Sequence, residues 1–471
     1  MLLHLRREKG FEISDVRLRL AERRLGQARE PAGDGRHPQR CSEVPQGHIV
    51  SNQAMPVAKT QHWDIPHAAC LSLKAGVYHN AKEETMTART DQISALLSRA
   101  IETSQVPGVA VAAVLPDGEI ISAAAGVQDM ATGVPMQPDS VVWIASMTKA
   151  ITTAAAMQCV EQGRLALDAP IAAVLPALAN PQVLEGFAAD GTPRLRPARG
   201  AITLRHLLTH TSGFVYDMWN ADIVRYLEKT GTPGITSCQN AALNLPLVFD
   251  PGSAWDYGIG IDWAGKAVEA VTGTTLGRYM QANIFEPLGM RDTGFRIRDA
   301  LRPRLARVHA RTPGGTEPID FSLPQEPEFE MGGGGLYATV GDYLRFARMI
   351  LGGGALDGVR VLAESTVAMM RANAMGTVRC RPMKSAVASA TNDVDFMDGW
   401  QWGLSFAINP QRLSTGRSAR SLTWAGLANS YYWIDPSKQV AGVYAAQILP
   451  FFDAPSVALF GDFEKAVYAM A

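Results

Sequence analysis

The most constraining feature of this sequence is a serine that opens an almost wholly apolar run. Residues 150–157 read AITTAAAM, so a helix formed here has no strongly polar face. A helix that is apolar nearly all round must be buried. The preceding residues 141–144 (VVWI) have the pattern of a short strand, and Gly163 is a typical helix stop. We therefore expect a strand that leads, at Ser146, into a helix at the centre of the molecule.

Lys149 follows Ser146 at a spacing of three residues, which places both side chains on one face of the helix. The lysine is disfavoured there twice, because the positive end of the helix dipole repels its charge and burial penalises the charged form. Both effects lower the pKa of the amine, which lets it accept a proton near neutral pH. The backbone N–H of Ser146 is also among the unpaired donors at the helix start, so it can form half of an oxyanion site.

The simpler interpretation is that Ser146 only caps the helix and that Lys149 reaches water. Short motifs of the S-x-x-K kind recur by chance, so the four residues alone favour this simpler interpretation. The surrounding sequence therefore carries more weight than the motif itself.

Strand patterns occur toward both ends of the chain. An amphipathic helix at 87–103 precedes a buried strand at 109–115, and a Pro-Asp-Gly turn leads into a second strand at 119–125. Four further strand-like segments precede a closing helix at 454–471; they lie at 403–408, 421–424, 430–434 and 440–447. Between these groups the chain consists of helical segments punctuated by Pro and Gly. We expect one sheet that is built from both ends of the chain, with helices packed on it.

The first 85 or so residues differ from the rest. An arginine-rich stretch at 14–30 is followed at 31–47 by Pro, Gly and charged residues without apolar periodicity. We interpret residues 1–85 as a mobile N-terminal extension, or as an over-long start whose true first residue is Met55 or Met86.

Charge and cysteine usage exclude several classes of partner. The net charge is -1 over 471 residues, so no global positive field attracts nucleic acid or a membrane surface. The five cysteines occur singly and in odd number, which argues against a disulfide framework or a zinc site and fits a reducing compartment. No apolar run is long enough to span a bilayer. We expect a cytoplasmic protein without nucleic-acid or membrane partners.

Other chemical motifs are weak. His206 and His210 lie four residues apart but lack the glutamate of the H-E-x-x-H zinc motif, and no G-x-S-x-G nucleophile elbow occurs. The glycines at 332–335 are not followed by the residues of a phosphate-binding loop, and they favour a close approach of backbone to substrate. The sequence therefore implies no metal and no cofactor. Several aromatic residues are candidates either for an apolar pocket or for ordinary core: Phe214, Tyr216, Trp219, Trp433 and Phe451.

Four stretches carry a resemblance to a known family: 143–149 (WIASMTK), 204–214 (LRHLLTHTSGF), 284–290 (IFEPLGM) and 332–339 (GGGGLYAT). From about residue 90 onward the chain resembles the serine β-lactamase and penicillin-binding-protein superfamily. More narrowly, it is similar to the class C β-lactamase-like carboxylesterases called family VIII esterases. The resemblance implies an α/β fold in which an antiparallel sheet is flanked by helices and carries an inserted, mostly helical domain. The expected domain bounds are one catalytic domain at 86–471, with its α/β part at about 86–150 and 330–471 and its helical part at about 151–330.

The resemblance also implies a catalytic tyrosine. Residues 255–259 (WDYGI) match the family's Y-x-N-type motif, which gives Tyr257 the role of general base and acid beside Ser146 and Lys149. A phenolate next to an ammonium is stabilised, so such a pair can pass a proton at neutral pH. Without the motif, the simpler interpretation is a core tyrosine with a satisfied hydroxyl.

The family's third element, K-T-G, corresponds to Trp424, Ala425 and Gly426 on a predicted edge strand. By resemblance, the backbone amide of Leu427 completes the oxyanion site. Two residues depart from the β-lactamase pattern: Trp424 replaces a lysine and Ile259 replaces an asparagine. The loss of a cation and an amide removes groups that favour an anionic, peptide-like substrate, and the apolar replacements suit a neutral ester.

The resemblance thus implies a serine carboxylesterase that hydrolyses short-chain carboxylic esters through an acyl-enzyme on Ser146. The expected partner is a small-molecule ester, and the oligomeric state stays open. Three alternatives remain: an acyltransferase that uses the same residues, β-lactamase or D-amino-acid peptidase activity, and a catalytically idle scaffold.

Overall fold

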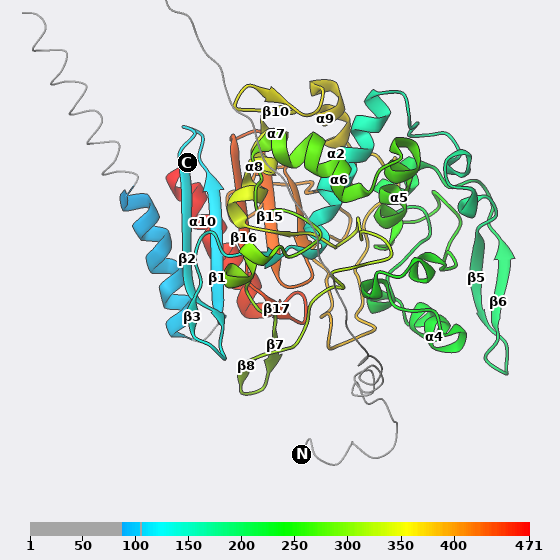
Figure 1. Cartoon of the computed structure of the whole chain (residues 1–471), viewed down its shortest axis with the longest axis horizontal. Coiled ribbons are helices and arrows are strands. Elements are labelled where there is room, and N and C mark those ends of the chain that lie inside the picture. The colour runs from blue at the N-terminus through cyan, green and yellow to red at the C-terminus, as the bar shows by residue number, and fades with distance from the viewer. Residues whose placement is uncertain (1–86, 104–105) are drawn as a thin grey trace, which may run out of the picture. The chain divides into compact units, whose positions relative to one another are not determined.

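The computed structural model describes residues 87–103 and 106–471 (Figure 1). Its centre is an eight-stranded sheet with the strand order β12-β13-β14-β15-β16-β1-β2-β3, and all neighbours in it are antiparallel. The strands are β1 (Gly108–Val114), β2 (Ile120–Asp129), β3 (Val134–Pro135), β12 (Gln401–Trp402), β13 (Ala407–Ile408), β14 (Leu422–Gly426), β15 (Ser430–Asp435) and β16 (Val440–Ala445). The expected extension at 1–85 lies outside the described residues.

The two ends of the chain meet in the middle of this sheet. Strand β1 pairs with its sequence neighbour β2 on one side and with the distant β16 on the other, where Val111 lies opposite Tyr444. The expected antiparallel sheet built from both chain ends is confirmed. The expected first helix is also present at 87–102, and its residues Ile93 and Leu97 are fully buried.

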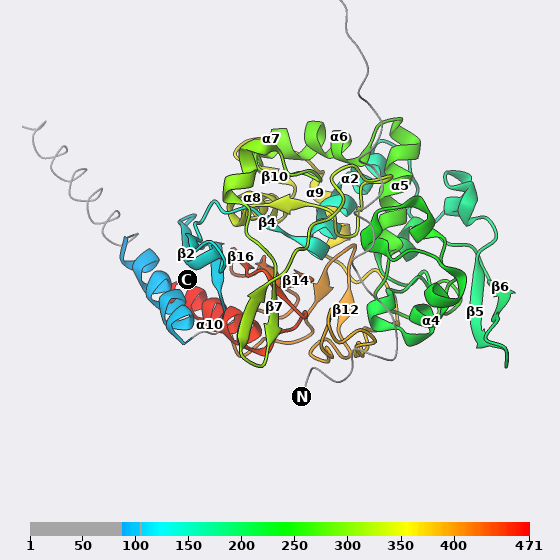
Figure 2. The same cartoon turned by 60° about the horizontal axis from the view of Figure 1, so that its bottom comes forward.

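Helices cover both faces of the sheet (Figure 2). In β15, Trp433 contacts the ring of Phe463 in α10 (Ala454–Met470), whereas the adjacent Tyr432 contacts the ring of Tyr343 in α8. Successive side chains of a strand point to opposite faces, so α10 and α8 (Val340–Leu351) must lie on opposite sides. This arrangement explains why every residue of β15 is buried.

The predicted central helix is α2 (Thr148–Glu161), which follows strand β4 (Val142–Trp143) and a single 3-10 turn (Ala145–Met147). Its residues are buried from Thr148 to Cys159, as expected for a helix that is apolar nearly all round. Helix α5 (Gly260–Thr272) packs against it. Serine and lysine of the S-x-x-K motif therefore stand at the centre of the protein.

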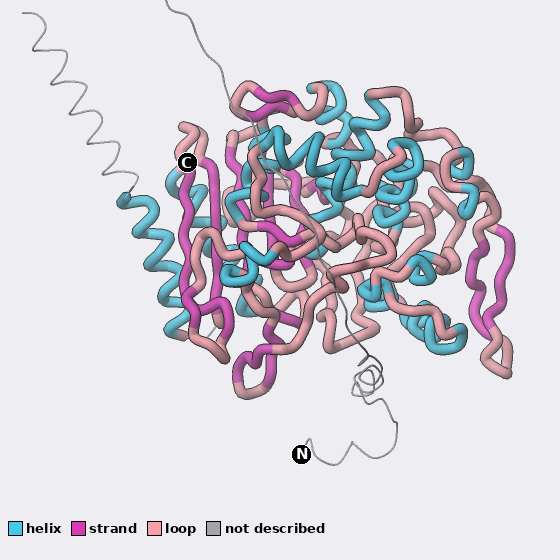
Figure 3. Tube along the Cα trace, in the orientation of Figure 1, coloured by secondary structure: helices cyan, strands magenta, loops and turns pink. Residues whose placement is uncertain are grey.

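The middle of the chain contains short helices and also strands that the sequence did not indicate (Figure 3). A hairpin forms from β5 (Gln182–Phe187) and β6 (Pro193–Pro197). Strand β6 buries no residue, so it lacks the apolar alternation by which a strand is recognised. Besides α5, the α-helices of this region are α3 (Leu204–Leu208), α4 (Ala221–Thr230), α6 (Leu276–Met280) and α7 (Glu286–Leu288).

Three small sheets and one helix complete the fold. The sheets consist of β17 (Ile448–Leu449) with β7 (His309–Thr312) and β8 (Gly315–Pro318), of β4 with β9 (Tyr337–Ala338), and of β10 (Ala355–Leu356) with β11 (Val359–Arg360). The helix is α9 (Glu364–Met370). Within residues 87–103 and 106–471, no helix is long and apolar enough to cross a membrane.

Candidate active site

Ser146 stands at a sharp bend between β4 and α2. The preceding residue, Ala145, has φ +43°, a left-handed backbone conformation that is uncommon for alanine. The bend leaves Ser146 partly exposed, whereas Ala145 and Met147 on either side are buried. No side chain caps the 3-10 turn or α2, so Ser146 is not a helix cap. Strained backbone of this kind clusters at functional sites. Here the bend directs the Ser146 hydroxyl toward a cavity that Ser146 lines.

Lys149 is buried, with 1% of its surface exposed, and does not reach water. Its Nζ lies 3.1 Å from the Ser146 Oγ, 2.9 Å from the Tyr216 hydroxyl and 2.5 Å from the carbonyl oxygen of Gly333. Burial lowers the pKa of the amine to about 7, and the nearby carboxylate of Asp262 acts in the opposite direction. The expected cause of a lowered pKa, burial in the first turn of α2, is therefore present.

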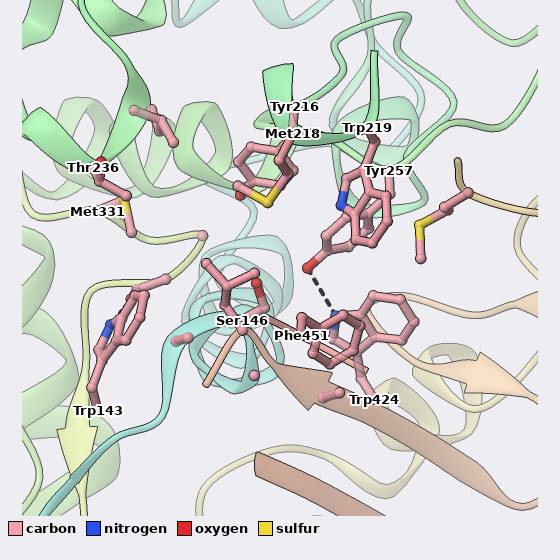
Figure 4. A pocket seen from close by; sticks show the side chains of 18 residues that line it. Trp143, Ser146, Tyr216, Met218, Trp219, Thr236, Tyr257, Met331, Trp424 and Phe451 are labelled. Atoms are coloured by element: carbon pink, nitrogen blue, oxygen red, sulfur yellow. Dashed lines mark hydrogen bonds between the residues drawn. The ribbon is translucent and has the colours of Figure 1, made fainter. Parts of the chain in front are cut away.

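Tyr257 comes from the loop before α5 and points into the same cavity (Figure 4). Its hydroxyl accepts a hydrogen bond from the Trp424 Nε1–H at 2.8 Å and is hydrogen bonded to Ser146. The Lys149 Nζ lies 4.7 Å from the centre of its ring. The structure thus brings together the three side chains that the sequence singled out.

The expected phenolate form of Tyr257 needs correction. The side chain is buried, and burial raises the pKa of its hydroxyl far above the usual value, although hydrogen bonds with Ser146 and Trp424 act against this shift. Burial disfavours an anion more strongly than these two hydrogen bonds stabilise it. At neutral pH the group is a phenol, which can donate a proton but is a poor base.

The two histidines that suggested a metal have structural positions. The His206 ring accepts a hydrogen bond from the Thr203 N–H and completes a capping box at the start of α3. His210 is buried, and its ring packs against that of Tyr257 with the two ring centres 4.6 Å apart. Among the residues that the structure describes, no group of three or more His, Cys, Asp or Glu side chains forms a candidate metal site.

The end of β14 forms one wall of the cavity. The prediction that β14 is an edge strand was wrong, because β13 pairs with its residues Leu422 and Thr423. The last residues of β14 nevertheless extend beyond that neighbour. Trp424, Gly426 and Leu427 line the cavity there. A Cβ on Gly426 would lie 2.3 Å from the carbonyl oxygen of Ile144, so only glycine lets this strand approach the chain before Ser146.

The cavity has mainly apolar walls. Of the aromatic candidates, Tyr216, Trp219 and Phe451 line it (Figure 4), whereas Phe214 and Trp433 do not. Its other lining residues are Trp143, Ala145, Ser146, Met218, Ile235, Thr236, Tyr257, Met331, Gly333, Gly334, Met383, Trp424, Ala425, Gly426 and Leu427.

Two expectations about the replaced residues change. Ile259 has no exposed surface and does not line the cavity, so it contributes to the core and offers no apolar surface to a substrate. Trp424 does line the cavity, but its indole N–H also holds the Tyr257 hydroxyl. The position that was expected to supply only apolar surface therefore also orients a polar group of the site.

Three groups surround Lys149 whose contact with it the sequence did not predict. These are the Tyr216 hydroxyl, the carbonyl oxygen of Gly333 and the carboxylate of Asp262. One of them left a signal: Asp262 lies in the otherwise apolar start of α5 (GIDWAG) and has no exposed surface. An acidic residue in a helix that must be buried is a candidate for pairing with a buried base. The other two depend on how distant segments pack.

Comparison with known proteins finds that this chain is similar to esterases and acyltransferases. A family model described as Beta-lactamase matches residues 93–460. A lovastatin esterase from Penicillium rubens is 34% identical over 372 residues, which cover 74% of this chain and 91% of that protein. A monacolin J acid methylbutanoyltransferase from Aspergillus terreus is 35% identical over 353 residues, which cover 71% of this chain and 83% of that protein.

Solved structures agree with these relatives. A mutant simvastatin synthase from Aspergillus terreus superposes with a TM-score of 0.70 and 30% identity, over 81% of this chain and 97% of that one. EstCE1, a hydrolase with promiscuous acyltransferase activity, superposes with a TM-score of 0.63 and 25% identity, over 82% of this chain and all of that one. The fold of this chain is therefore that of the β-lactamase-like enzymes.

Proposed function

This chain belongs to the beta-lactamase family and is an enzyme that acts through an acyl-enzyme, and we propose that it is a serine carboxylesterase for short-chain esters. One observation carries the proposal: a buried, weakly basic amine contacts a hydroxyl at the wall of an apolar cavity. No Lys or Arg is among the residues that line this cavity. A neutral ester suits such a cavity, whereas a carboxylate substrate needs a cation.

In the proposed first step, Ser146 Oγ attacks the ester carbonyl carbon while Lys149 takes the hydroxyl proton. The oxygen that becomes negative is held by the backbone N–H groups of Ser146 and Leu427. The C–O bond of the ester then breaks, and the leaving alkoxide receives a proton from the Tyr257 hydroxyl, which regains one from the Lys149 ammonium. The products of this step are an alcohol and an acyl ester on Ser146.

In the second step water attacks the acyl carbon by the reverse route. Lys149 takes a proton from the water, and the Ser146 oxygen leaves with a proton, so the carboxylic acid is released and the site is restored. Tyr257 serves as an acid in this scheme, because its hydroxyl stays protonated at neutral pH. The Trp424 N–H orients that hydroxyl toward Ser146.

An acyltransferase is the second candidate function. The acyl-enzyme is the same, but an alcohol instead of water accepts the acyl group. The observation that favours it is the similarity to a monacolin J acid methylbutanoyltransferase, and to EstCE1, a hydrolase with promiscuous acyltransferase activity. Measuring how products partition between acid and new ester, in the presence of an added alcohol, separates the two functions.

The esterase proposal is tested with p-nitrophenyl esters of graded acyl length. We expect the wild type to prefer short acyl chains, and Ser146→Ala, Lys149→Ala and Tyr257→Phe each to lose at least about a hundredfold in kcat/KM. An unchanged rate in any one variant would remove that residue from the mechanism. If nitrocefin were hydrolysed faster than every ester, the β-lactamase alternative would replace this proposal.

A further inference from the structure

The Lys149 amine has more partners than the acyl-transfer scheme uses. Besides Ser146, it contacts the Tyr216 hydroxyl at 2.9 Å and the Gly333 carbonyl oxygen at 2.5 Å. A neutral amine has two N–H groups and one lone pair. If both N–H groups are donated to Tyr216 and Gly333, the lone pair is left facing Ser146. The two additional contacts therefore determine whether the lone pair of Lys149 points at the proton of the Ser146 hydroxyl.

Both of these partners, Tyr216 and Gly333, lie beside one carboxylate, that of Asp262. Asp262, in the first turn of α5, has no exposed surface, and its Oδ1 accepts the Gly333 N–H at 2.7 Å. A Cβ on Gly333 would lie 2.3 Å from Asp262 Oδ2 and 2.8 Å from the Tyr216 hydroxyl, so both oxygens converge on this glycine. Oδ2 makes no hydrogen bond of good geometry with any of residues 87–103 and 106–471, but the Tyr216 hydroxyl is near enough to act on this carboxyl as a hydrogen-bond donor, which lowers its pKa. Tyr216 is placed to donate to it.

We propose that Asp262 is a positioning residue for acyl transfer, which acts through Tyr216 and the backbone of Gly333 to aim the lone pair of Lys149 at Ser146. This inference rests on the proposed function, in which Lys149 is the base. The chain of donors runs from the Ser146 O–H to Lys149, from Lys149 to Tyr216, and from Tyr216 to Asp262. Buried polar groups need such partners, because a carboxylate without them is costly in the interior.

The charges around Lys149 give the direction of the expected effect. Tyr216 and Tyr257 contact the amine, and burial raises the pKa of both hydroxyls, so both are neutral. Burial, together with Lys149, lowers the pKa of His210 well below its usual value, so this ring is neutral as well. Burial raises the pKa of Asp262 to about 6, against the effect of Lys149, so above that pH Asp262 is the negative group that opposes the effect of burial on Lys149.

Burial raises the pKa of the Cys238 thiol to about 12, and the charge of Asp262 acts on this thiol in the same direction. It is therefore uncharged across the range in which the lysine titrates. Removing the carboxylate while keeping its shape should consequently lower the pKa of Lys149 and also loosen its orientation.

The test measures the pH dependence of Ser146 labelling by a fluorophosphonate. In this reaction Oγ displaces fluoride from phosphorus and its proton passes to Lys149, so the rate reports the activated serine without requiring an ester substrate. For Asp262→Asn we expect the acid midpoint of the labelling rate to fall by about one pH unit. We also expect the plateau rate to fall about tenfold to a hundredfold, because the amine is less well aimed.

Asp435→Asn is a matched control for a merely structural effect. Asp435 is also fully buried and accepts hydrogen bonds from a backbone N–H, that of Ser418, and from a tyrosine hydroxyl, that of Tyr468, but it lies outside the active site. We expect this variant to lower the thermal midpoint while the pH midpoint of labelling stays at the wild-type value. The same pH midpoint in Asp262→Asn, Asp435→Asn and wild type would overturn the proposal.

Tyr216→Phe tests the same chain by removing one hydroxyl. We expect its pH midpoint and plateau to fall, and the double variant with Asp262→Asn to lose less than the two single losses combined, because part of the effect of Asp262 passes through the Tyr216 hydroxyl. If Asp262→Asn does not fold, an unchanged midpoint in Tyr216→Phe overturns the proposal by itself. A wild type that is labelled but hydrolyses no ester would contradict the esterase function and leave this inference standing. A wild type that is never labelled would refute both.

Discussion

At the scale of single residues, the chemistry of this protein depends on where one amine is buried. An exposed lysine is protonated at neutral pH and cannot accept a proton from serine. Lys149 is enclosed between α2 and the loops that carry Tyr216 and Tyr257, and burial lowers its pKa to about 7. The same enclosure raises the pKa of Tyr257, which keeps its proton. One environment therefore prepares a base and an acid side by side.

The pH profile of the reaction follows from the Lys149 amine. Its neutral form is the active one, so we expect kcat/KM for a p-nitrophenyl ester to increase as the pH rises through about 7 and then to level off. The rate should fall again only at pH values where the protein loses its fold, because Tyr257 keeps its proton. An acid limb centred near the pKa of an ordinary lysine, about 10, would show that Lys149 is not shifted and would contradict this assignment.

At the scale of elements, the site depends on how closely two loops pack. The Tyr216 N–H donates to the Tyr257 carbonyl oxygen at 3.1 Å, so the two tyrosine-bearing segments run side by side. A Cβ on Gly258 would lie 2.1 Å from the Phe214 carbonyl oxygen and 2.4 Å from the Val215 Cα. These are backbone atoms, which cannot move away as a flexible side chain can. The glycine after the catalytic tyrosine is thus required by packing.

Gly258→Ala should therefore separate the two segments. We expect a loss of about 1–3 kcal/mol in the free energy of unfolding, from overpacking, and at least a tenfold decrease in kcat, on the order of what a small misplacement of catalytic groups costs. Urea denaturation and ester hydrolysis measure the two effects.

Gly461→Ala is the control for this substitution. Gly461 lies within α10, and a Cβ there meets no atom within 4 Å. Because glycine is a poor helix former, alanine should stabilise the protein by about 0.5–1 kcal/mol and leave kcat unchanged. If Gly258→Ala behaved in the same way, the packing argument for Gly258 would be wrong.

At the scale of the whole molecule, the last helix, α10, covers one face of the central sheet. In α10, Glu464 is almost fully buried and accepts two hydrogen bonds from the Arg417 guanidinium, at 2.7 and 2.6 Å. The Thr415 hydroxyl donates a third at 2.8 Å. A buried carboxylate with all of its partners is tolerated, but one that has lost its cation is not.

Arg417→Met should lower the free energy of unfolding by about 3–5 kcal/mol, because Glu464 then stays buried without a countercharge. The double variant Arg417→Met, Glu464→Met should recover most of that loss, since it removes the unpaired charge too. Urea denaturation of both variants measures this. If the single variant were as stable as the wild type, the assigned role of the buried ion pair would be wrong.

Lys384→Ala is the control, because it breaks the exposed ion pair with Asp393. We expect no measurable change in its free energy of unfolding.

Those parts of this protein that depend on local periodicity were predictable from the amino-acid sequence. The apolar run after Ser146 required a buried helix, and the spacing of Ser146 and Lys149 placed them together on one face of it. The strands near both ends and the closing helix α10 were predictable for the same reason, since apolar alternation and helical period are written in neighbouring residues. Matching motifs added Tyr257 and the end of β14.

The surroundings of these groups depend instead on how distant segments pack in three dimensions. The bond from Trp424 to Tyr257 and the contact of Lys149 with Gly333 each join segments more than a hundred residues apart. No local pattern encodes such pairs, because they depend on the packing of α2, α5 and β14 around one cavity. The protonation state of Tyr257 is such a case: its motif is local, but the burial that keeps its proton in place comes from the whole fold.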